Sequence, residues 1–65
     1  SYKVGDMVSC SFVAENNGGD YSSVNPPCES VYLDGGQYYV SQCSSGWGKH
    51  NCFGGSGKDC CVKVQ

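Results

Sequence analysis

The residues with the clearest chemistry in this chain are its cysteines, six in only 65 residues. They are Cys10, Cys28, Cys43, Cys52, Cys60 and Cys61. A short chain with this density of cysteine is typical of a disulfide scaffold from an oxidising compartment. Because the count is even, every thiol can pair. We therefore predict three disulfides and an extracellular, secreted protein whose fold is lost on reduction.

The adjacent pair Cys60 and Cys61 restricts how the disulfides connect. Neighbouring residues of a strand point to opposite faces of a sheet, so these two cysteines should bond partners on opposite sides. Excluding a bond between them still leaves most of the 15 possible pairings open. Among these we favour an interlocked order with the bonds Cys10–Cys52, Cys28–Cys60 and Cys43–Cys61.

The spacing of the cysteines and of the titratable residues predicts neither a metal site nor an active site. Zinc sites use paired ligands such as C-x₂-C, whereas the intervals between these cysteines hold 17, 14, 8, 7 and 0 residues. His50 is the side chain suited to acid–base catalysis near neutral pH, and no spacing links it to Glu15 or Glu29. We therefore expect no metal, no cofactor and no enzymatic activity.

The charge of the chain argues against partners that are held by phosphate or lipid headgroups. It has four Lys, no Arg and six acidic residues, which gives a net charge of −2. A phosphate-binding surface needs clustered cations, and a membrane-active peptide needs a basic face. No apolar run approaches the length of a membrane span. We expect a monomer with no nucleic acid partner and no membrane span. The sequence starts at Ser1, as we would expect of a secreted protein after removal of its signal peptide.

The pattern of side chains predicts a single all-β domain over residues 1–65. Residues 7–14 alternate between apolar and polar side chains, which indicates a half-buried strand with Cys10 and Phe12 facing inward. Residues 60–64 alternate in the same way and predict a last strand. Apolar residues nowhere recur at helical spacing for more than a turn, so we expect at most one short helical turn in a stapled antiparallel sheet, sandwich or barrel.

Residues 30–43 carry the clearest hairpin signal. Two runs rich in β-forming residues, 30–33 and 37–41, flank Asp34-Gly35-Gly36, and both Asp-Gly and Gly-Gly suit a type I′ turn. A turn on Gly35-Gly36 pairs Tyr32 with Tyr39, whereas a turn on Asp34-Gly35 shifts the register by two residues. In both registers two faces are predicted, one with Val31, Leu33, Tyr38 and Val40, and the other with Tyr32, Tyr39, Ser41 and Cys43.

The aromatic residues supply the candidate contact site. The segment 44–59 is glycine-rich and aperiodic, so we expect a loop tethered at Cys52, in which Trp47 is either a lid on the core or the centre of a contact site. Tyr32 and Tyr39 form an exposed platform if no second layer covers their face. The candidate binding residues are Trp47, Lys49, His50, Phe53, Tyr32 and Tyr39.

In its size, number of disulfides and richness in Gly, Ser, Tyr and Asn, the chain resembles small secreted cysteine-rich proteins of fungi, among them antifungal proteins and plant-pathogen effectors. This resemblance implies a small disulfide-bonded β-sandwich or barrel, although the basic antifungal proteins are rich in Lys and this chain is acidic. The stretch Gln37-Tyr38-Tyr39-Val40-Ser41-Gln42-Cys43 is similar to the aromatic-to-cysteine stretch of invertebrate chitin-binding modules, whose other cysteine spacings differ.

Three functions fit these features. The first is a secreted, non-enzymatic interaction protein, of the effector or antifungal and toxin-like kind, that presents loops and aromatics to an extracellular protein or polysaccharide. The second is a carbohydrate-binding module for chitin or a related glucan. The third is a small protease inhibitor that uses residues 44–59 or 25–28 as its exposed loop.

Overall fold

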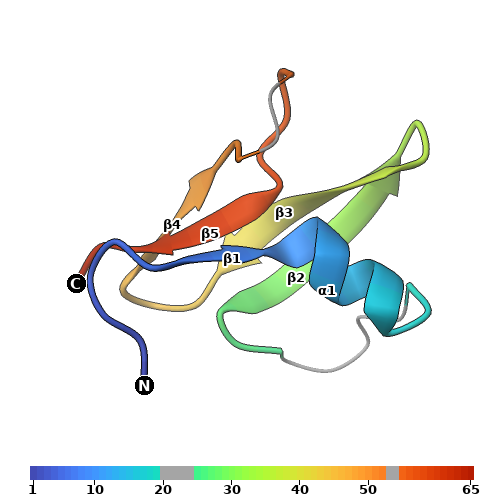
Figure 1. Ribbon diagram of the computed structural model, residues 1–65. Coiled ribbons are helices and arrows are strands. Elements are labelled where there is room, and N and C mark those ends of the chain that lie inside the picture. The colour runs from blue at the N-terminus through green and yellow to red at the C-terminus, as the bar shows by residue number, and fades with distance from the viewer. Residues whose placement is uncertain (20–24, 53–54) are drawn as a thin grey trace.

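The computed structural model describes residues 1–19, 25–52 and 55–65, and strands dominate it (Figure 1). The elements are β1 (Met7–Ser9), α1 (Cys10–Asn16), β2 (Cys28–Asp34), β3 (Gln37–Cys43), β4 (Trp47–His50) and β5 (Cys60–Lys63). The strands form two antiparallel sheets that three disulfides connect, with one short helix. The predicted all-β, disulfide-stapled fold is therefore confirmed.

The two sheets are a three-stranded sheet in the order β1-β5-β4 and the hairpin β2-β3. The central strand β5 pairs with β1 through Met7 and Val62, and with β4 through Gly48 and Val62. The hairpin crosses one side of this sheet, and α1 follows β1 toward the hairpin (Figure 1). The small core lies between the two sheets, because it combines the hairpin residue Val40 with Cys61 of β5.

The hairpin forms with the turn on Gly35-Gly36. Tyr32 pairs with Tyr39, as the first of the two predicted registers requires. Gly35 and Gly36 have φ angles of 59° and 81°, and a type I′ turn needs positive φ at both central residues. This turn therefore selects the register.

The predicted assignment of side chains to the two faces of the hairpin is correct near the turn and wrong near the base of the hairpin. The register shifts between Cys28 and Ser30 and again between Ser30 and Val31. Such bulges place an extra residue on one strand and change which face the following side chains occupy. Cys43 therefore packs with Val40 in the core instead of sharing the face of the two tyrosines.

The predicted strand over residues 7–14 is wrong from Cys10 onward, because that part of the chain forms α1. The Ser9 side chain caps this helix by accepting a hydrogen bond of 3.2 Å from the Phe12 backbone N–H. Cys10 and Ala14 are buried, and residues four apart also share one face of a helix. The alternation at these two positions thus fits a helix as well as a strand. Phe12 consequently faces outward, with 64% of its surface exposed.

The predicted loop over residues 44–59 contains β4. Gly46 adopts a φ of 87° before this strand, and the Trp47 backbone N–H donates to the Ser44 carbonyl at 2.9 Å. The strand then runs antiparallel to β5, with Lys49 opposite Cys61. The sequence pattern did not predict this strand because the segment is rich in glycine, and glycine weakens the side-chain alternation on which a strand prediction depends.

The disulfides are Cys10–Cys28, Cys43–Cys61 and Cys52–Cys60. The predicted Cys43–Cys61 bond is confirmed, and Cys60 and Cys61 do bond different partners. The predicted Cys10–Cys52 and Cys28–Cys60 bonds are wrong. The cause is β4, which pairs His50 with Cys60 and so carries Cys52 to the same end of β5. Cys10 is left beside Cys28 of the hairpin.

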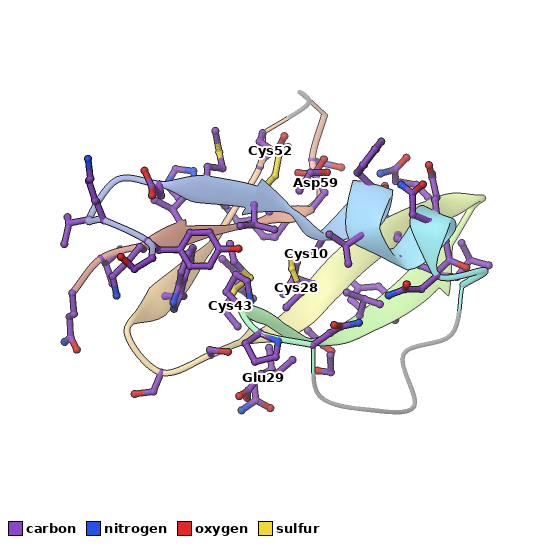
Figure 2. The ribbon with its side chains drawn as sticks, turned by 60° about the horizontal axis from the view of Figure 1, so that its bottom comes forward. Cys10, Cys28, Glu29, Cys43, Cys52 and Asp59 are labelled. Carbon is purple, nitrogen blue, oxygen red and sulfur yellow. A yellow bond between two sulfur atoms is a disulfide. The ribbon has the colours of Figure 1, made fainter. Side chains whose placement is uncertain are left out.

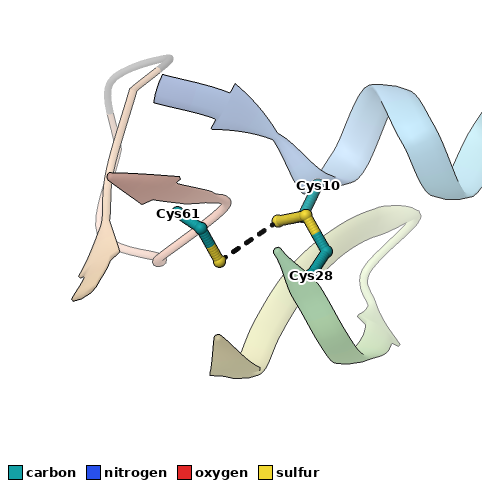
Figure 3. Close-up of side chains that lie close together, drawn as sticks. All are labelled: Cys10, Cys28 and Cys61. Carbon is teal, nitrogen blue, oxygen red and sulfur yellow. Dashed lines mark hydrogen bonds between the residues drawn. A yellow bond between two sulfur atoms is a disulfide. The ribbon is translucent and has the colours of Figure 1, made fainter. Parts of the chain in front are cut away.

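Two of these disulfides touch in the centre of the molecule. The Sγ atoms of Cys10 and Cys61 are 3.5 Å apart (Figure 3). Neither sulfur carries a proton in its disulfide, so this is a packing contact between Cys10–Cys28 and Cys43–Cys61. Among the described residues, the largest side chains with almost no exposed surface are all cysteines: Cys10, Cys28, Cys60 and Cys61. Sulfur thus fills the place that larger apolar residues take in bigger domains.

We predict that the disulfides differ in how much they stabilise the fold. Replacing Cys10 and Cys28 together by Ala should lower the free energy of unfolding by about 3 kcal/mol or more, because it frees a longer loop and empties the buried centre. Replacing Cys52 and Cys60 together should cost less, because those cysteines are separated by 8 residues instead of 18 and Cys52 is only half-buried. Denaturant unfolding of both double variants measures this, and a reversed order would contradict it.

We also predict that the hairpin turn depends on positive φ. Gly35→Val should lower the free energy of unfolding by more than about 1 kcal/mol, because a β-branched residue resists φ > 0. Gly35→Asn is the matched control, since Asn tolerates this conformation, and it should cost much less. Equal losses for both variants in thermal or denaturant unfolding would show that the turn does not require this conformation.

Candidate functional site

The predicted site residues do not come together in one place. Trp47, Lys49 and His50 lie on β4, whereas Tyr32 and Tyr39 lie on the hairpin. Phe53 lies outside the described residues. The candidate contacts on the described chain therefore divide into a region around Trp47 and a region around Tyr39.

Trp47 is half-buried and packs against the core. The Tyr2 ring meets it edge-on, with ring centroids 4.9 Å apart and planes at 89°. The Lys63 ammonium lies 5.6 Å from the Trp47 ring centroid, within the range of a cation–π interaction. Residues of the same chain therefore cover part of the indole. This favours the interpretation of Trp47 as a lid on the core over its interpretation as the centre of a contact site.

Lys49 and His50 are both exposed on β4. The backbone carbonyl of His50 accepts a hydrogen bond of 3.1 Å from the Asp59 backbone N–H. Glu29, one of the carboxylates considered as a partner for His50, instead accepts a hydrogen bond of 3.3 Å from the Ser44 hydroxyl. Across residues 1–19, 25–52 and 55–65, no hydrogen bond joins the His50 side chain to a carboxylate, the pairing that would orient it for acid–base catalysis.

The two hairpin tyrosines lie side by side. Their ring centroids are 5.7 Å apart with planes at 41°, a tilted arrangement. Tyr32 is half-exposed at 50%, whereas Tyr39 is partly covered. Part of that cover is Gly57, because a side chain at this position would overlap the Tyr39 ring. The predicted platform is thus open at Tyr32 and becomes the wall of a cavity at Tyr39.

That cavity is an open hollow of about 460 Å³ between α1, β3 and the segment before β5. We call it the Tyr39 hollow. It is bordered by Ser11, Phe12, Glu15, Gln37, Tyr39, Gly55, Ser56 and Asp59. The sequence predicted only Tyr39 among these as a contact residue.

Hydrogen bonds hold the three sides of the hollow together. The Gln37 side-chain amide donates to the Ser11 hydroxyl at 2.9 Å, which joins β3 to α1. The Asp59 carbonyl accepts from the backbone N–H groups of Cys10 and Ser11 at 3.0 and 3.4 Å, which joins the last segment to the helix. The Val40 N–H donates to the Lys58 carbonyl at 2.6 Å, which joins β3 to that same segment.

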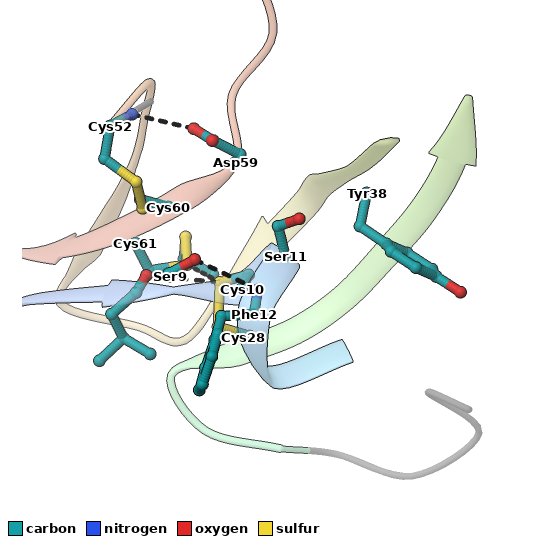
Figure 4. The surroundings of a disulfide bond; sticks show 12 residues. Ser9, Cys10, Ser11, Phe12, Cys28, Tyr38, Cys52, Asp59, Cys60 and Cys61 are labelled. Carbon is teal, nitrogen blue, oxygen red and sulfur yellow. Dashed lines mark hydrogen bonds between the residues drawn. A yellow bond between two sulfur atoms is a disulfide. The ribbon is translucent and has the colours of Figure 1, made fainter. Parts of the chain in front are cut away.

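Asp59 is the most buried polar residue of the hollow, with 3% of its surface exposed. Its Oδ1 accepts a hydrogen bond of 2.9 Å from the Cys52 backbone N–H, beside the Cys52–Cys60 disulfide (Figure 4). Within the part of the chain that the structure describes, Oδ2 has no hydrogen-bond partner. The carboxylate is therefore held by one oxygen and retains capacity to accept a donor with the other.

The electrostatic character of the hollow is negative. Two acidic residues, Glu15 and Asp59, belong to its lining, and no Lys or His does among the described residues. The helix adds no anion site, because the first N–H groups of α1 already donate to the Asp59 carbonyl and the Ser9 hydroxyl. The hollow thus suits a ligand that donates hydrogen bonds or carries positive charge.

Two groups of possible metal ligands lie close together, but their sulfurs are already bonded. They are Cys10, Cys28 and Cys61, and Cys52, Asp59 and Cys60. Figure 2 shows Asp59 beside Cys52, with Cys10, Cys28 and Cys43 in the interior. A metal binds cysteine as a thiolate, and all six cysteines are in disulfides. Neither group can hold a metal in this state.

The residues that sequence reasoning missed are those placed by α1. Phe12 and Glu15 reach the hollow because residues three apart share one side of a helix. Ser9 before the helix and the glycines after Asn17 were the available signals of its two ends. They were outweighed by the strand-like alternation from Val8 to Ala14.

We predict that Trp47→Ala lowers the free energy of unfolding by about 2–3 kcal/mol. This is below the usual loss for a fully buried Trp, because the indole is only half-buried. Tyr2→Ala should cause a smaller loss, since it removes only the edge contact. The measurement is denaturant unfolding of both variants. A stability of Trp47→Ala within about 0.5 kcal/mol of the wild type would contradict the lid interpretation.

Comparisons of the chain with protein-family models, with curated proteins and with solved structures find no match. No helix among the described residues is both long enough and apolar enough to cross a membrane. The three disulfides are consistent with an extracellular protein. The function is therefore inferred from the geometry of the Tyr39 hollow and its surroundings.

Proposed function

We propose that the protein is a secreted, non-enzymatic interaction protein of the effector or antifungal and toxin-like kind, and that it binds an extracellular protein through the Tyr39 hollow. The observation that carries this proposal is the position of Phe12. Its ring borders the hollow and is 64% exposed, on a helix whose other face is anchored by buried cysteine and alanine. An exposed aromatic at the rim of a concave polar site is a typical anchor for a partner.

The energetics support this use of Phe12. Burying a Phe side chain is worth about 1.5–3 kcal/mol, and this chain leaves most of that surface in water. A core of four buried cysteines, Ala14 and Val40 is small, so an unused Phe is a substantial share of the apolar surface that the chain could bury. A partner that covers the ring would recover this free energy.

The rigidity of the hollow also supports a binding role. Hydrogen bonds tie its three sides to one another, and the Cys10–Cys28 and Cys52–Cys60 disulfides fix the helix and the last segment close by. A site that is already formed loses less conformational entropy when it binds. A secreted scaffold with bonded thiols keeps this shape in an oxidising medium.

A carbohydrate-binding function for chitin or a related glucan is the second candidate. It is favoured by the paired rings of Tyr32 and Tyr39, which offer an aromatic surface next to hydroxyl and amide groups of the hollow. The proposed protein-binding function ranks first because the lining includes two acidic residues and the exposed Phe12 is not part of the tyrosine pair. The protease-inhibitor function has no comparable support on the described chain, where part of residues 44–59 is the strand β4.

The test compares two variants that each remove an exposed apolar side chain without changing the net charge. Phe12→Ala alters the hollow, and Val64→Ala alters the chain near its C-terminus, at 64% and 56% exposed positions. The tagged proteins are screened against a display library of extracellular protein domains and, separately, against washed insoluble chitin and β-glucan. We expect a domain that binds the wild type and Val64→Ala but not Phe12→Ala, because only Phe12 belongs to the hollow.

Two results would contradict the proposal. One is equal binding of the library domain by both variants, which would place the contact elsewhere. The other is retention on chitin or β-glucan with no library domain bound, which would favour the carbohydrate-binding function. One-dimensional proton spectra of both variants check that each has kept the native fold.

A further inference from the structure

We infer that the Tyr39 hollow receives a basic side chain, lysine or arginine, from the protein partner. This inference rests on the proposed protein-binding function and names the chemical group that the hollow selects. The lining includes two acidic residues, Glu15 and Asp59, and no cationic residue of the described chain, so the charged residues around a positive group in the hollow are all of opposite sign.

The aromatic rings add a second reason. Phe12 and Tyr39 both border the hollow, and the face of an aromatic ring attracts an ammonium or guanidinium group. The aliphatic stem of lysine or arginine can at the same time cover the exposed part of Phe12, since these side chains bury their stems along apolar surface. One side chain would thus satisfy both the apolar and the acidic parts of the lining.

Asp59 gives the third reason. It is almost fully buried, and one of its oxygens has no partner within the described residues. A buried carboxylate oxygen without a donor is costly, and an ammonium or guanidinium supplies a charge-assisted donor. Glu15, in contrast, is exposed at the rim of the hollow. It can therefore attract a cation to the rim of the hollow.

The chain's own cations do not fill this place. The side chain of Lys58 is exposed, and although Lys58 precedes Asp59 in the sequence it is not part of the lining. Lys63 lies over Trp47 instead. The acidic lining is therefore left for a group from another molecule.

The test uses small probes that differ in a single group. N-acetyl-lysine methylamide and N-acetyl-norleucine methylamide share one shape, and only the first carries an ammonium. Each is titrated into the ¹⁵N-labelled protein while backbone amide shifts are followed. We expect saturable shifts at Ser11, Gln37 and Ser56 with the lysine probe, weaker at high salt because the attraction is electrostatic. The norleucine probe should cause no comparable shifts.

A pair of charge variants locates the binding. Glu15→Gln and Glu29→Gln each change the net charge by the same amount. Only Glu15 borders the hollow; Glu29 lies on β2, far from Asp59 in the view of Figure 2. Gln at position 29 keeps an oxygen that can accept from Ser44. We expect Glu15→Gln to weaken lysine binding about threefold or more, and Glu29→Gln to leave it unchanged.

Three results would overturn the inference: equal shifts with lysine and norleucine, equal weakening by both variants, or a stronger response at the same amides to chitotriose. The comparison of lysine with norleucine in the wild type needs no variant, so it stands even if Glu15→Gln misfolds. If a library domain depends on Phe12 while the lysine probe causes no shifts, the proposed function stands and this inference fails. If binding of the domain does not depend on Phe12, the proposed function itself fails.

Discussion

The contact between two disulfides at the centre of the molecule is the constraint on which the rest of the structure depends. Cys10–Cys28 attaches the start of α1 to the hairpin, and Cys43–Cys61 attaches the other end of the hairpin's base to β5. Their sulfur atoms meet at 3.5 Å, so the two bonds occupy the space where the sheets face each other. A domain of this size has too little apolar surface for a large core. Covalent bonds between the sheets supply part of the stability that packing supplies in larger domains.

The same arrangement explains why the binding surface lies at α1. Once Cys10 is fixed beside Cys28, α1 buries Cys10, Ser11 and Ala14, whereas Phe12 and Glu15 are exposed. Phe12 and Glu15 are then placed beside Tyr39 of the hairpin. Asp59, which precedes Cys60 and accepts a hydrogen bond from the Cys52 N–H, also borders the hollow. The scaffold thus brings an exposed aromatic residue and two acidic residues together from segments far apart in the sequence.

The sequence predicted the parts of the fold that depend on local pattern. The hairpin follows from Gly35-Gly36 and its flanking β-rich runs, and β5 follows from the alternation after Asp59. The helix could not be predicted from alternation, because burial of Cys10 and Ala14 fits a spacing of two as well as a spacing of four. Two disulfides were predicted wrongly because the pairing of the cysteines depends on β4. This strand was not predicted, since Gly48 interrupts the side-chain alternation that indicates a strand. The hollow could not be predicted because α1, which was predicted as a strand, supplies part of its lining. Of the lining residues, the sequence pattern indicated only Tyr39 as a contact residue.

The central claim is that the bonded cysteines hold the hairpin against α1 and thereby form the hollow. Nuclear Overhauser contacts between the Gln37 side-chain amide and Ser11 report this arrangement directly, because the two residues come from β3 and α1. In the native protein we expect these contacts to be present. In a variant with Cys10 and Cys28 both replaced by Ala, we expect them to disappear. If they persisted at native intensity in that variant, the hairpin and helix would be held together by other interactions, and the account would be contradicted.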